Sequence, residues 1–275
     1  MSGLGRRDWR AGLKDILPSP VVRLLRRIVP PRTGFLGDYP TWAQAVADST
    51  GYDQAAILAK VRGACLEVKS GRAVHERDGV LFPRIEYSWP LLAGLLLAAA
   101  RSGGRLHVLD FGGSLGTTYL QNRRFLAQLA EVSWSVVEQL HYVEVGRREF
   151  ADDRLDFFPD VDACLAVRHP TVLLTSGVLP YLERPFAVLD GILRHRFPWI
   201  LIDRTTFSKC GRQRLVVQRI PASITGASYP CWLFARDGFT GYFAARGYTC
   251  VESFFEYEDY GDDVSSQGFI YAAQV

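Results

Sequence analysis

The fold class of this chain is decided by the stretch Val108-Leu109-Asp110-Phe111-Gly112-Gly113-Ser114-Leu115-Gly116. Its first part is a short apolar run that is typical of a buried strand, and its second part is a glycine-rich turn. A helical pattern follows from Thr117, so the stretch predicts a strand, a tight turn and a helix in that order. Because glycine lacks a Cβ atom, such a turn lets the backbone approach a nucleotide-like cofactor closely.

A carboxylate stands where a nucleoside-binding site needs one. The next predicted strand ends at Glu138, about 20 residues beyond the last glycine, where a carboxylate hydrogen-bonds ribose hydroxyls. The combination predicts a cofactor that contains adenosine. The alternative is a tight strand-to-helix turn followed by an incidental glutamate. Phe111 argues against a dinucleotide, because the fingerprint G-x-G-x-x-G would need glycine at that position for close approach to a pyrophosphate.

Short apolar runs alternate with longer helical or loop stretches from Trp89 onward. A buried helix is predicted at 91–100, with Gly103 and Gly104 just beyond its end. Five strands are predicted at residues 106–111, 134–137, 155–158, 172–175 and 199–202. Strands that alternate with helices indicate βαβ units, and hence a parallel sheet covered on both faces.

The carboxyl-terminal part of the chain has a different pattern. Two strand-like runs, 248–257 and 269–273, are joined only by a loop around Gly261. That connection is too short for a parallel crossover, so we expect the last strand to pair antiparallel.

Residues 1–88 contain turn signals and short helical patterns, and no run among them has a clear strand pattern. We therefore expect a helical extension at 1–88 and a sheet domain at 89–275. Much of the chain's positive charge lies in residues 1–32, where apolar residues recur at roughly helical spacing among arginines. One interpretation is an amphipathic segment in weak peripheral contact with an anionic membrane. The other is a packed helix or a loosely ordered arm, which Pro18 and Pro20 favour because they interrupt the apolar face.

Composition narrows the function classes. The chain is 48% hydrophobic and 22% charged with a net charge of +3, as in ordinary soluble proteins, and gives no reason to expect a nucleic-acid partner. Its five cysteines are scattered without metal-ligand or redox spacing, so we expect no metal and a reducing, cytoplasmic location. The longest apolar run, 91–100, is about half of the ~20 residues that cross a bilayer.

The glycine-rich stretch resembles the D/E-x-G-x-G-x-G loop of class I S-adenosylmethionine (SAM) dependent methyltransferases. Asp110, Gly112 and Gly116 match that loop, whereas Ser114 replaces its middle glycine. Because the Cβ of a serine restricts φ, we expect Gly113 to shape the turn instead. The antiparallel last strand and Gly247-Tyr248 before the sixth strand also fit this class. The resemblance implies a Rossmann-like α/β fold with a seven-stranded sheet, and SAM as the cofactor.

From about Gly34 the chain more closely resembles a little-characterised bacterial family assigned as methyltransferases and often associated with surface-polysaccharide biosynthesis. The motifs that carry this resemblance are Gly34-Phe35-x-Gly37-x-Tyr39-x-x-Trp42, Arg77-Asp78, the stretch 109–116, Leu179-Pro180-Tyr181-Leu182 and Ile202-Asp203-Arg204. The resemblance implies a methyltransferase and leaves the methyl acceptor open.

Candidate site residues lie beyond the carboxyl ends of the predicted strands, where open α/β sheets bind ligands. The candidates for cofactor binding are Asp110, Gly112, Gly113, Ser114, Gly116, Glu138, Asp160, Ser176 and Gly177. Asp160 follows the third strand, where this class often contacts the adenine amino group.

The candidates for catalysis are Asp203, Arg204 and Tyr181. A charged pair directly after an apolar strand has to lie at a rim or cleft, and the alternative for Asp203-Arg204 is an ion pair that fixes a loop. Tyr181 either lines the acceptor pocket or makes a hydrophobic contact at a helix start. His75-Glu76-Arg77-Asp78 either covers the cofactor and orients the acceptor or, as the default interpretation, forms a solvated loop.

The leading hypothesis is a SAM-dependent O-methyltransferase that acts on a small-molecule or glycan-like acceptor. In such a reaction the enzyme mainly holds acceptor and methyl group in line, and a nearby base helps an alcohol acceptor to react. One alternative is a nicotinamide-dependent oxidoreductase. Another is a catalytically inactive Rossmann-like scaffold in polysaccharide assembly.

Overall fold

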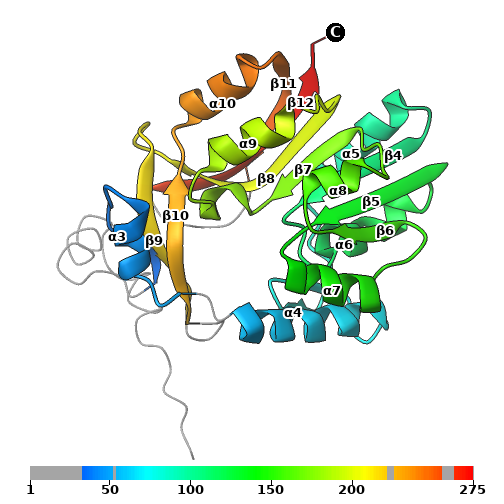
Figure 1. The fold of residues 1–275 in the computed structure, drawn as a ribbon, viewed down its shortest axis with the longest axis horizontal. Coiled ribbons are helices and arrows are strands. Elements are labelled where there is room, and N and C mark those ends of the chain that lie inside the picture. The colour runs from blue at the N-terminus through cyan, green and yellow to red at the C-terminus, as the bar shows by residue number, and fades with distance from the viewer. Residues whose placement is uncertain (1–32, 52–53, 222–225, 256–262, 275) are drawn as a thin grey trace, which may run out of the picture.

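A seven-stranded mixed sheet forms the centre of the computed structural model, which describes residues 33–51, 54–221, 226–255 and 263–274. The strand order is β11-β12-β8-β7-β4-β5-β6 (Figure 1). In chain order these strands are β4 (Arg105–Phe111), β5 (Glu131–Val137), β6 (Leu155–Phe158), β7 (Val172–Ser176), β8 (Trp199–Ser208), β11 (Tyr248–Phe255) and β12 (Val264–Ala273). Strands β4 to β8 pair parallel, whereas β12 pairs antiparallel with both β8 and β11. The predicted Rossmann-like sheet with an antiparallel last strand is confirmed.

Each of the five predicted parallel strands is present, and the main difference lies in β8. This strand continues to Ser208, six residues beyond the predicted end at 202, because its second half pairs with β12 rather than with β7. Asp203 and Arg204 therefore lie inside a strand and do not follow it, which corrects the sequence-based expectation.

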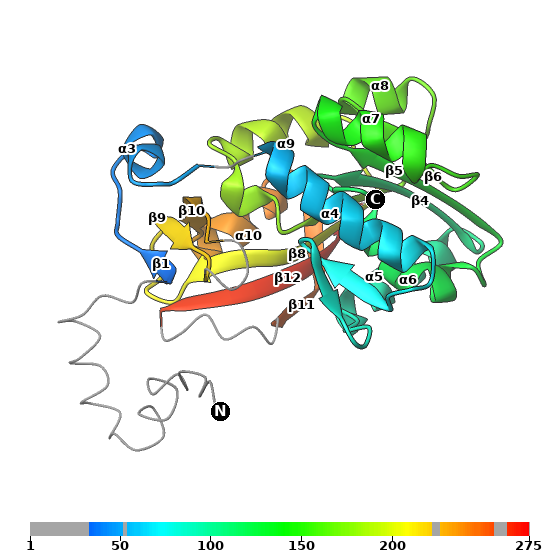
Figure 2. The ribbon, with the colours of Figure 1, turned by 90° about the horizontal axis from the view of Figure 1, so that it is seen from below.

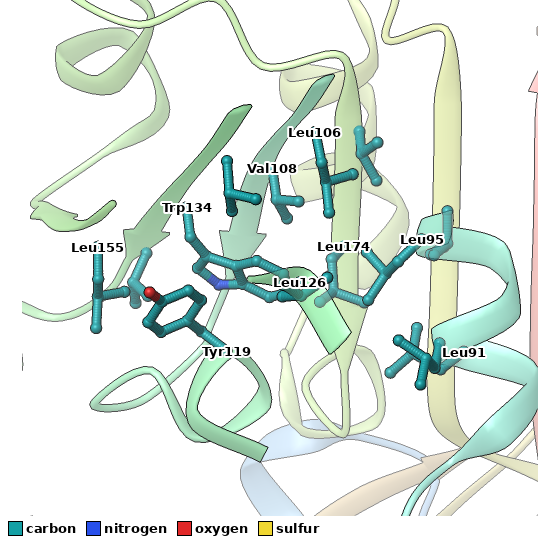
Figure 3. Close-up of a cluster of buried hydrophobic side chains, with 14 of the residues drawn as sticks. Leu91, Leu95, Leu106, Val108, Tyr119, Leu126, Trp134, Leu155 and Leu174 are labelled. Atoms are coloured by element: carbon teal, nitrogen blue, oxygen red, sulfur yellow. The ribbon is translucent and has the colours of Figure 1, made fainter. Parts of the chain in front are cut away.

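Helices cover both faces of the sheet. One face carries α4 (Gln54–Lys69), α5 (Trp89–Arg101), α6 (Thr117–Leu126) and α7 (Leu140–Glu149), and the other carries α8 (Val161–Leu165), α9 (Pro185–Leu193) and α10 (Arg236–Ala244). Successive residues of a strand point to opposite faces, so Val108 of β4 joins the first core and Leu109 joins the second. Figure 3 shows part of the first core, where Trp134 packs among leucines from the sheet and helices.

A second, smaller sheet lies beside the main one, to its left in Figure 1. It joins β1 (Gly34–Leu36), β9 (Arg214–Arg219) and β10 (Ser228–Leu233) in antiparallel order, with α3 (Trp42–Ala47) packed against it. The sequence did not predict these strands. β1 is three residues long and too short to show alternation, and Pro230 lies inside β10, where proline is tolerated because β10 is an edge strand of this sheet.

The region 33–88 also contains a hairpin, formed by β2 (His75–Arg77) and β3 (Val80–Phe82). The expectation of no strand in residues 1–88 is therefore wrong for the described part of that region. Helix α4 runs across the molecule in Figure 2 and buries Val61 and Cys65 in the same core as β4 and β5. The division at residue 88 stays a prediction.

Both interpretations of the basic segment fall on residues 1–32, which lie outside the described residues. Of the helices that the structure describes, none combines the length and the apolar character needed to cross a membrane.

Candidate functional site

The glycine-rich turn follows β4 and leads into α6. Gly112, Ser114 and Gly116 adopt positive φ angles of 74°, 55° and 84°, whereas Gly113 does not. The left-handed position that we expected at Gly113 is therefore taken by Ser114, a residue for which that conformation is uncommon. Gly113 is needed for a different reason. A Cβ atom on it would lie 2.4 Å from Oδ2 of Asp110, so a side chain there would displace that carboxylate.

Asp110 is buried at the end of β4, with a side chain that satisfies only part of its hydrogen-bonding capacity. Nε1 of Trp134 donates a hydrogen bond of 3.0 Å to Oδ2. Within the described part of the chain, Oδ1 has no hydrogen-bond partner, although buried carboxylate oxygens are normally paired. Burial raises the pKa of Asp110 to about 7, and the negative charges of Glu138 and Asp203 add to that rise.

Glu138 follows β5 and returns to the glycine-rich turn. Its half-buried carboxylate accepts hydrogen bonds from the backbone N–H groups of Gln139, at 2.7 Å, and Ser114. Burial raises the pKa of Glu138, and these two hydrogen bonds oppose the rise. The carboxylate that sequence spacing assigned to the cofactor thus lies against the turn itself.

A bulge in β8 presents the pair Asp203-Arg204. In the pairing of β8 with β12, both residues lie opposite Gly268, and Arg204 has a positive φ of 50°. Asp203 is buried, and its carboxylate accepts hydrogen bonds from Oγ of Ser176 at 2.9 Å and Oγ of Ser88 at 3.4 Å. Ser176 is aligned with Asp203 across the parallel strands, at the carboxyl end of β7.

The Arg204 guanidinium bridges the sheet and the hairpin. It forms an ion pair of 2.9 Å with Asp78, which lies in the turn between β2 and β3. It also packs over Gly177, where a Cβ atom would lie 3.2 Å from Nη2. The ion pair between Arg204 and Asp78 therefore fixes the turn of the hairpin, in agreement with the alternative interpretation of Asp203-Arg204. The hairpin forms one wall of a cavity.

This cavity has a volume of about 580 Å³. Its walls come from the end of β7, from the bulge in the middle of β8, from the first turns of α6, from the hairpin and from the segment before α5. The lining residues are His75, Arg77, Arg84, Ile85, Glu86, Tyr87, Ser88, Trp89, Thr117, Thr118, Gln121, Ser176, Asp203 and Arg204. The carboxyl edge of the sheet, the predicted place for a ligand, thus opens onto the cavity.

The hairpin contributes two buried polar residues that the sequence analysis assigned to a solvated loop. His75 and Glu76 are 3% and 2% exposed, so that default interpretation is wrong for both. The missed signal is Asp78-Gly79, whose φ angles of 53° and 75° form the two-residue turn between the paired residues Arg77 and Val80. An Asp-Gly pair is a strong local signal for such a hairpin.

Glu76 anchors the hairpin to the helices. Its carboxylate accepts hydrogen bonds from Oγ1 of Thr117, from the Cys65 thiol at 3.2 Å and from the Gly79 N–H at 3.2 Å. Burial raises the pKa of Glu76. Thr117 is the first residue of α6 and directly follows the glycine-rich turn. The buried Glu76 carboxylate therefore holds the hairpin against the start of α6.

Of the predicted site residues, Ser176, Asp203 and Arg204 line this cavity, and the others, Tyr181 and Asp160 among them, are not part of its lining. The Tyr181 hydroxyl donates to Oε1 of Gln218 at 2.8 Å, the ring meets Tyr229 edge-on, and burial raises its pKa well above the ordinary value. Asp160 is exposed and caps α8 by accepting from the Ala163 N–H at 2.7 Å. The structure thus brings together Asp110, Glu138, Ser176, Gly177 and the pair 203–204. Tyr181 lies within electrostatic range of Arg204 but outside the cavity lining, and Asp160 is exposed at the start of α8.

The charges around the glycine-rich turn are unbalanced. The carboxylates of Asp110, Glu138 and Asp203 repel one another at the carboxyl edge, and among the described residues the Trp134 indole donates to Oδ2 of Asp110 while Oδ1 has no donor. Such an arrangement favours a ligand that carries positive charge and hydrogen-bond donors. In the part of the chain that the structure describes, no group of three metal-ligating side chains lies together.

No protein-family model and no curated protein matches the sequence. Among solved structures, the N-terminal domain of EvdMO1 in the presence of S-adenosylhomocysteine (SAH) and D-fucose is 16% identical, with a TM-score of 0.49 over 81% of this chain and 98% of that one. The 1,6-didemethyltoxoflavin-N1-methyltransferase of Burkholderia thailandensis is 15% identical, with a TM-score of 0.44 over 83% and 93%. The magnesium protoporphyrin IX methyltransferase of Synechocystis PCC 6803 is 11% identical, with a TM-score of 0.44 over 99% and 100%. Similarities this distant leave the function to be argued from the residues of this chain.

Proposed function

We propose that this protein is a SAM-dependent methyltransferase that methylates a hydroxyl group of a small-molecule or glycan-like acceptor. The observation that carries the proposal is the buried Asp110 carboxylate. One of its oxygens has no partner among the described residues, and two further carboxylates repel it. A ligand that places positive charge beside Asp110 removes both costs together.

The charge of the candidate cofactors separates them. SAM carries a sulfonium and an ammonium group, whereas a nicotinamide dinucleotide carries a negatively charged pyrophosphate. A pyrophosphate next to Asp110, Glu138 and Asp203 would add repulsion at a site that already holds three carboxylates. The electrostatics therefore support SAM over the oxidoreductase alternative, in agreement with Phe111 in the turn.

The residues present fit SAM. We assign Glu138 to the ribose hydroxyls, and Asp110 and Asp203 to the positively charged end. The turn 112–116 and Ser176-Gly177 provide the close backbone approach, with left-handed angles at Gly112, Gly116 and Gly177. Asp160 as an adenine contact stays a prediction, because its Oδ1 already caps α8. When bound, SAM supplies a methyl group that is electrophilic because its sulfur is positively charged.

The contribution of this chain to the reaction is mainly to hold the reacting groups in position. Methyl transfer is a direct displacement, so holding the acceptor oxygen in line accounts for much of the rate. Asp203 is held by two serine hydroxyls, and Arg204 by Asp78, so both are oriented before any ligand arrives. Tyr181 is a poor base, because its hydroxyl donates to Gln218 and its pKa is raised. We therefore propose a role for it only in holding η1 (Leu179–Tyr181) against the small sheet.

The cavity supports an acceptor with several polar groups and at least one apolar face. Its outer part combines Tyr87 and Trp89, whose rings lie 4.8 Å apart, with polar side chains such as Gln121. Trp89 is 58% exposed, so its ring is available to a ligand at the mouth. Aromatic walls with a few polar groups are typical of small-molecule sites. A cytoplasmic location and a link to polysaccharide assembly rest on the sequence and stay predictions.

Calorimetric titration with SAM, and in parallel with NADH, tests the proposal. We expect SAM to bind and NADH not to bind, and we expect Asp110→Asn and Glu138→Gln to weaken SAM binding at least tenfold. Glu131→Gln is the matched control, because Glu131 lies at the opposite end of β5 from Glu138. Failure of the wild-type protein to bind SAM at millimolar concentration would refute the proposal, and binding without turnover on any acceptor would favour the scaffold alternative.

A further inference from the structure

His75 is the histidine that lines the cavity, and its surroundings differ from those of a surface histidine. The residue is 3% exposed, and its ring lies 5.6 Å from that of Phe82 in the paired strand. Since successive residues of a strand point in opposite directions, Glu76 faces the helices while the ring of His75 lines the cavity. Glu76, which anchors the hairpin, and His75, which lines the cavity, are therefore adjacent residues of β2.

We infer that His75 accepts the proton that a hydroxyl acceptor loses during methylation, and that Glu76 is a positioning residue that holds it at the cavity. This inference rests on the proposed function and narrows it, because it assigns the acceptor to the chemical class of alcohols and phenols. In the step, the acceptor oxygen forms a bond to the methyl carbon while the carbon–sulfur bond breaks and its electrons remain on sulfur. The hydroxyl proton moves to a ring nitrogen of His75, which later releases it to solvent.

The charged groups around His75 keep its imidazole neutral, which is the form that can accept the hydroxyl proton. Burial lowers its pKa, the positive charges of Arg77 on β2 and Arg204 on β8 lower it further, and the negative charge of Glu86 opposes them. Arg84 and Asp203 line the same cavity. His75 is therefore neutral at neutral pH, and a neutral imidazole has a ring nitrogen that can accept a proton.

The other candidate bases on the cavity wall are less suitable. The Asp203 carboxylate already accepts from two serine hydroxyls, and we assign it to the cofactor. The Glu86 carboxylate lies 3.9 Å from the guanidinium of Arg77 and 4.0 Å from that of Arg84, so two ion pairs already engage it. His75 remains as the neutral imidazole on the cavity wall, and the burial and arginine charges that lower its pKa are a cost that the reacting oxyanion has to offset.

The experiment uses para-nitrophenolate as a stable oxyanion probe, with and without SAH, at about pH 8. We expect the probe to bind as the anion, which its visible spectrum reports. We also expect it to draw up to one proton onto His75, because the bound oxyanion stabilises imidazolium. Proton uptake is measured by calorimetry in two buffers of different ionisation enthalpy.

We expect His75→Asn and His75→Gln to abolish the proton uptake while SAH affinity changes less than threefold. Glu76→Gln should reduce the uptake while retaining SAH binding. His169→Asn is the matched control, because His169 is exposed before the amino end of β7. No probe binding, an anion bound without proton uptake by the wild type, or unchanged uptake in folded His75 variants would overturn the inference. Absence of SAH and SAM binding would instead refute the proposed function.

Discussion

The glycine-rich turn and the β2–β3 hairpin both adjoin the candidate site, but they reach it in different ways. The turn is one continuous stretch between a buried strand and a helix, and its carboxylates lie at neighbouring strand ends. The hairpin comes from residues 75–82 and is fixed by the buried contacts of Glu76 with Cys65 and Thr117. The turn places the carboxylates of Asp110 and Glu138 near each other, whereas the hairpin and the segment after it carry charges of both signs, including Arg77 and Arg84 on the cavity wall. In line with the proposed function, we assign the turn to the cationic cofactor and the hairpin to the acceptor.

The largest expected effect is on the turn. Asp110→Asn keeps the shape of the side chain and removes its charge, so SAM affinity should fall about a hundredfold, or ~2.7 kcal/mol. The unfolding free energy of the ligand-free protein should not fall, because the buried carboxylate is a cost in the absence of a cation. Calorimetry and denaturant titration measure the two quantities. A variant that loses stability and binding in parallel would show that Asp110 is only structural.

The second prediction concerns the hairpin. Glu76→Ala leaves the Thr117 hydroxyl and the Gly79 N–H without their acceptor, which should cost about 1–3 kcal/mol of unfolding free energy. Hydrogen exchange should accelerate at residues 75–82 while the strands of the main sheet stay protected. SAM affinity should change far less than in Asp110→Asn. A loss of SAM binding as large as in that variant would contradict the division between turn and hairpin.

The third prediction tests the close approach at Gly113. A Cβ atom there would meet Asp110 Oδ2 at 2.4 Å, so Gly113→Ala should lower SAM affinity about tenfold, or ~1.4 kcal/mol, by displacing the carboxylate. Gly241→Ala in α10 is the control, because a Cβ atom at that position meets no atom within 4 Å. Equal SAM affinities for Gly113→Ala and the wild type would show that the carboxylate position does not matter.

The smallest effect is expected at Ser114. Its φ of 55° is left-handed, and glycine adopts that region without steric cost. Ser114→Gly should therefore raise the unfolding free energy slightly, by about 0.5 kcal/mol, since the relief of strain exceeds the entropy that glycine adds to the unfolded chain. The N–H that binds Glu138 is retained, so SAM affinity should stay within twofold. A clear loss of stability would mean that the serine side chain makes a contact that offsets the strain.

The comparison also separates what the sequence could and could not predict. Local patterns in the sequence predict the parallel strands, the antiparallel last strand and the acidic positions near the turn. Each of these features depends on a short apolar run and on the residues directly after it. The expectation that Gly113 shapes the turn in place of Ser114 is wrong, because the sequence pattern does not show that the Asp110 side chain folds back against Gly113 and that Ser114 takes a left-handed φ. The burial of Glu76 could not be predicted, because its partners Cys65 and Thr117 lie far apart in the chain. The hairpin itself had a local signal in Asp78-Gly79.

The pH dependence of SAM binding tests the central claim most directly. In the ligand-free protein the pKa of Asp110 is raised to about 7, and a bound cation favours the ionised form. Protons therefore compete with SAM below that pKa, so the affinity of the wild-type protein should rise about tenfold from pH 6 to pH 8. Asp110→Asn should bind more weakly and show no such rise. A wild-type affinity that is flat across this range, or an equal rise in Asp110→Asn, would contradict the account.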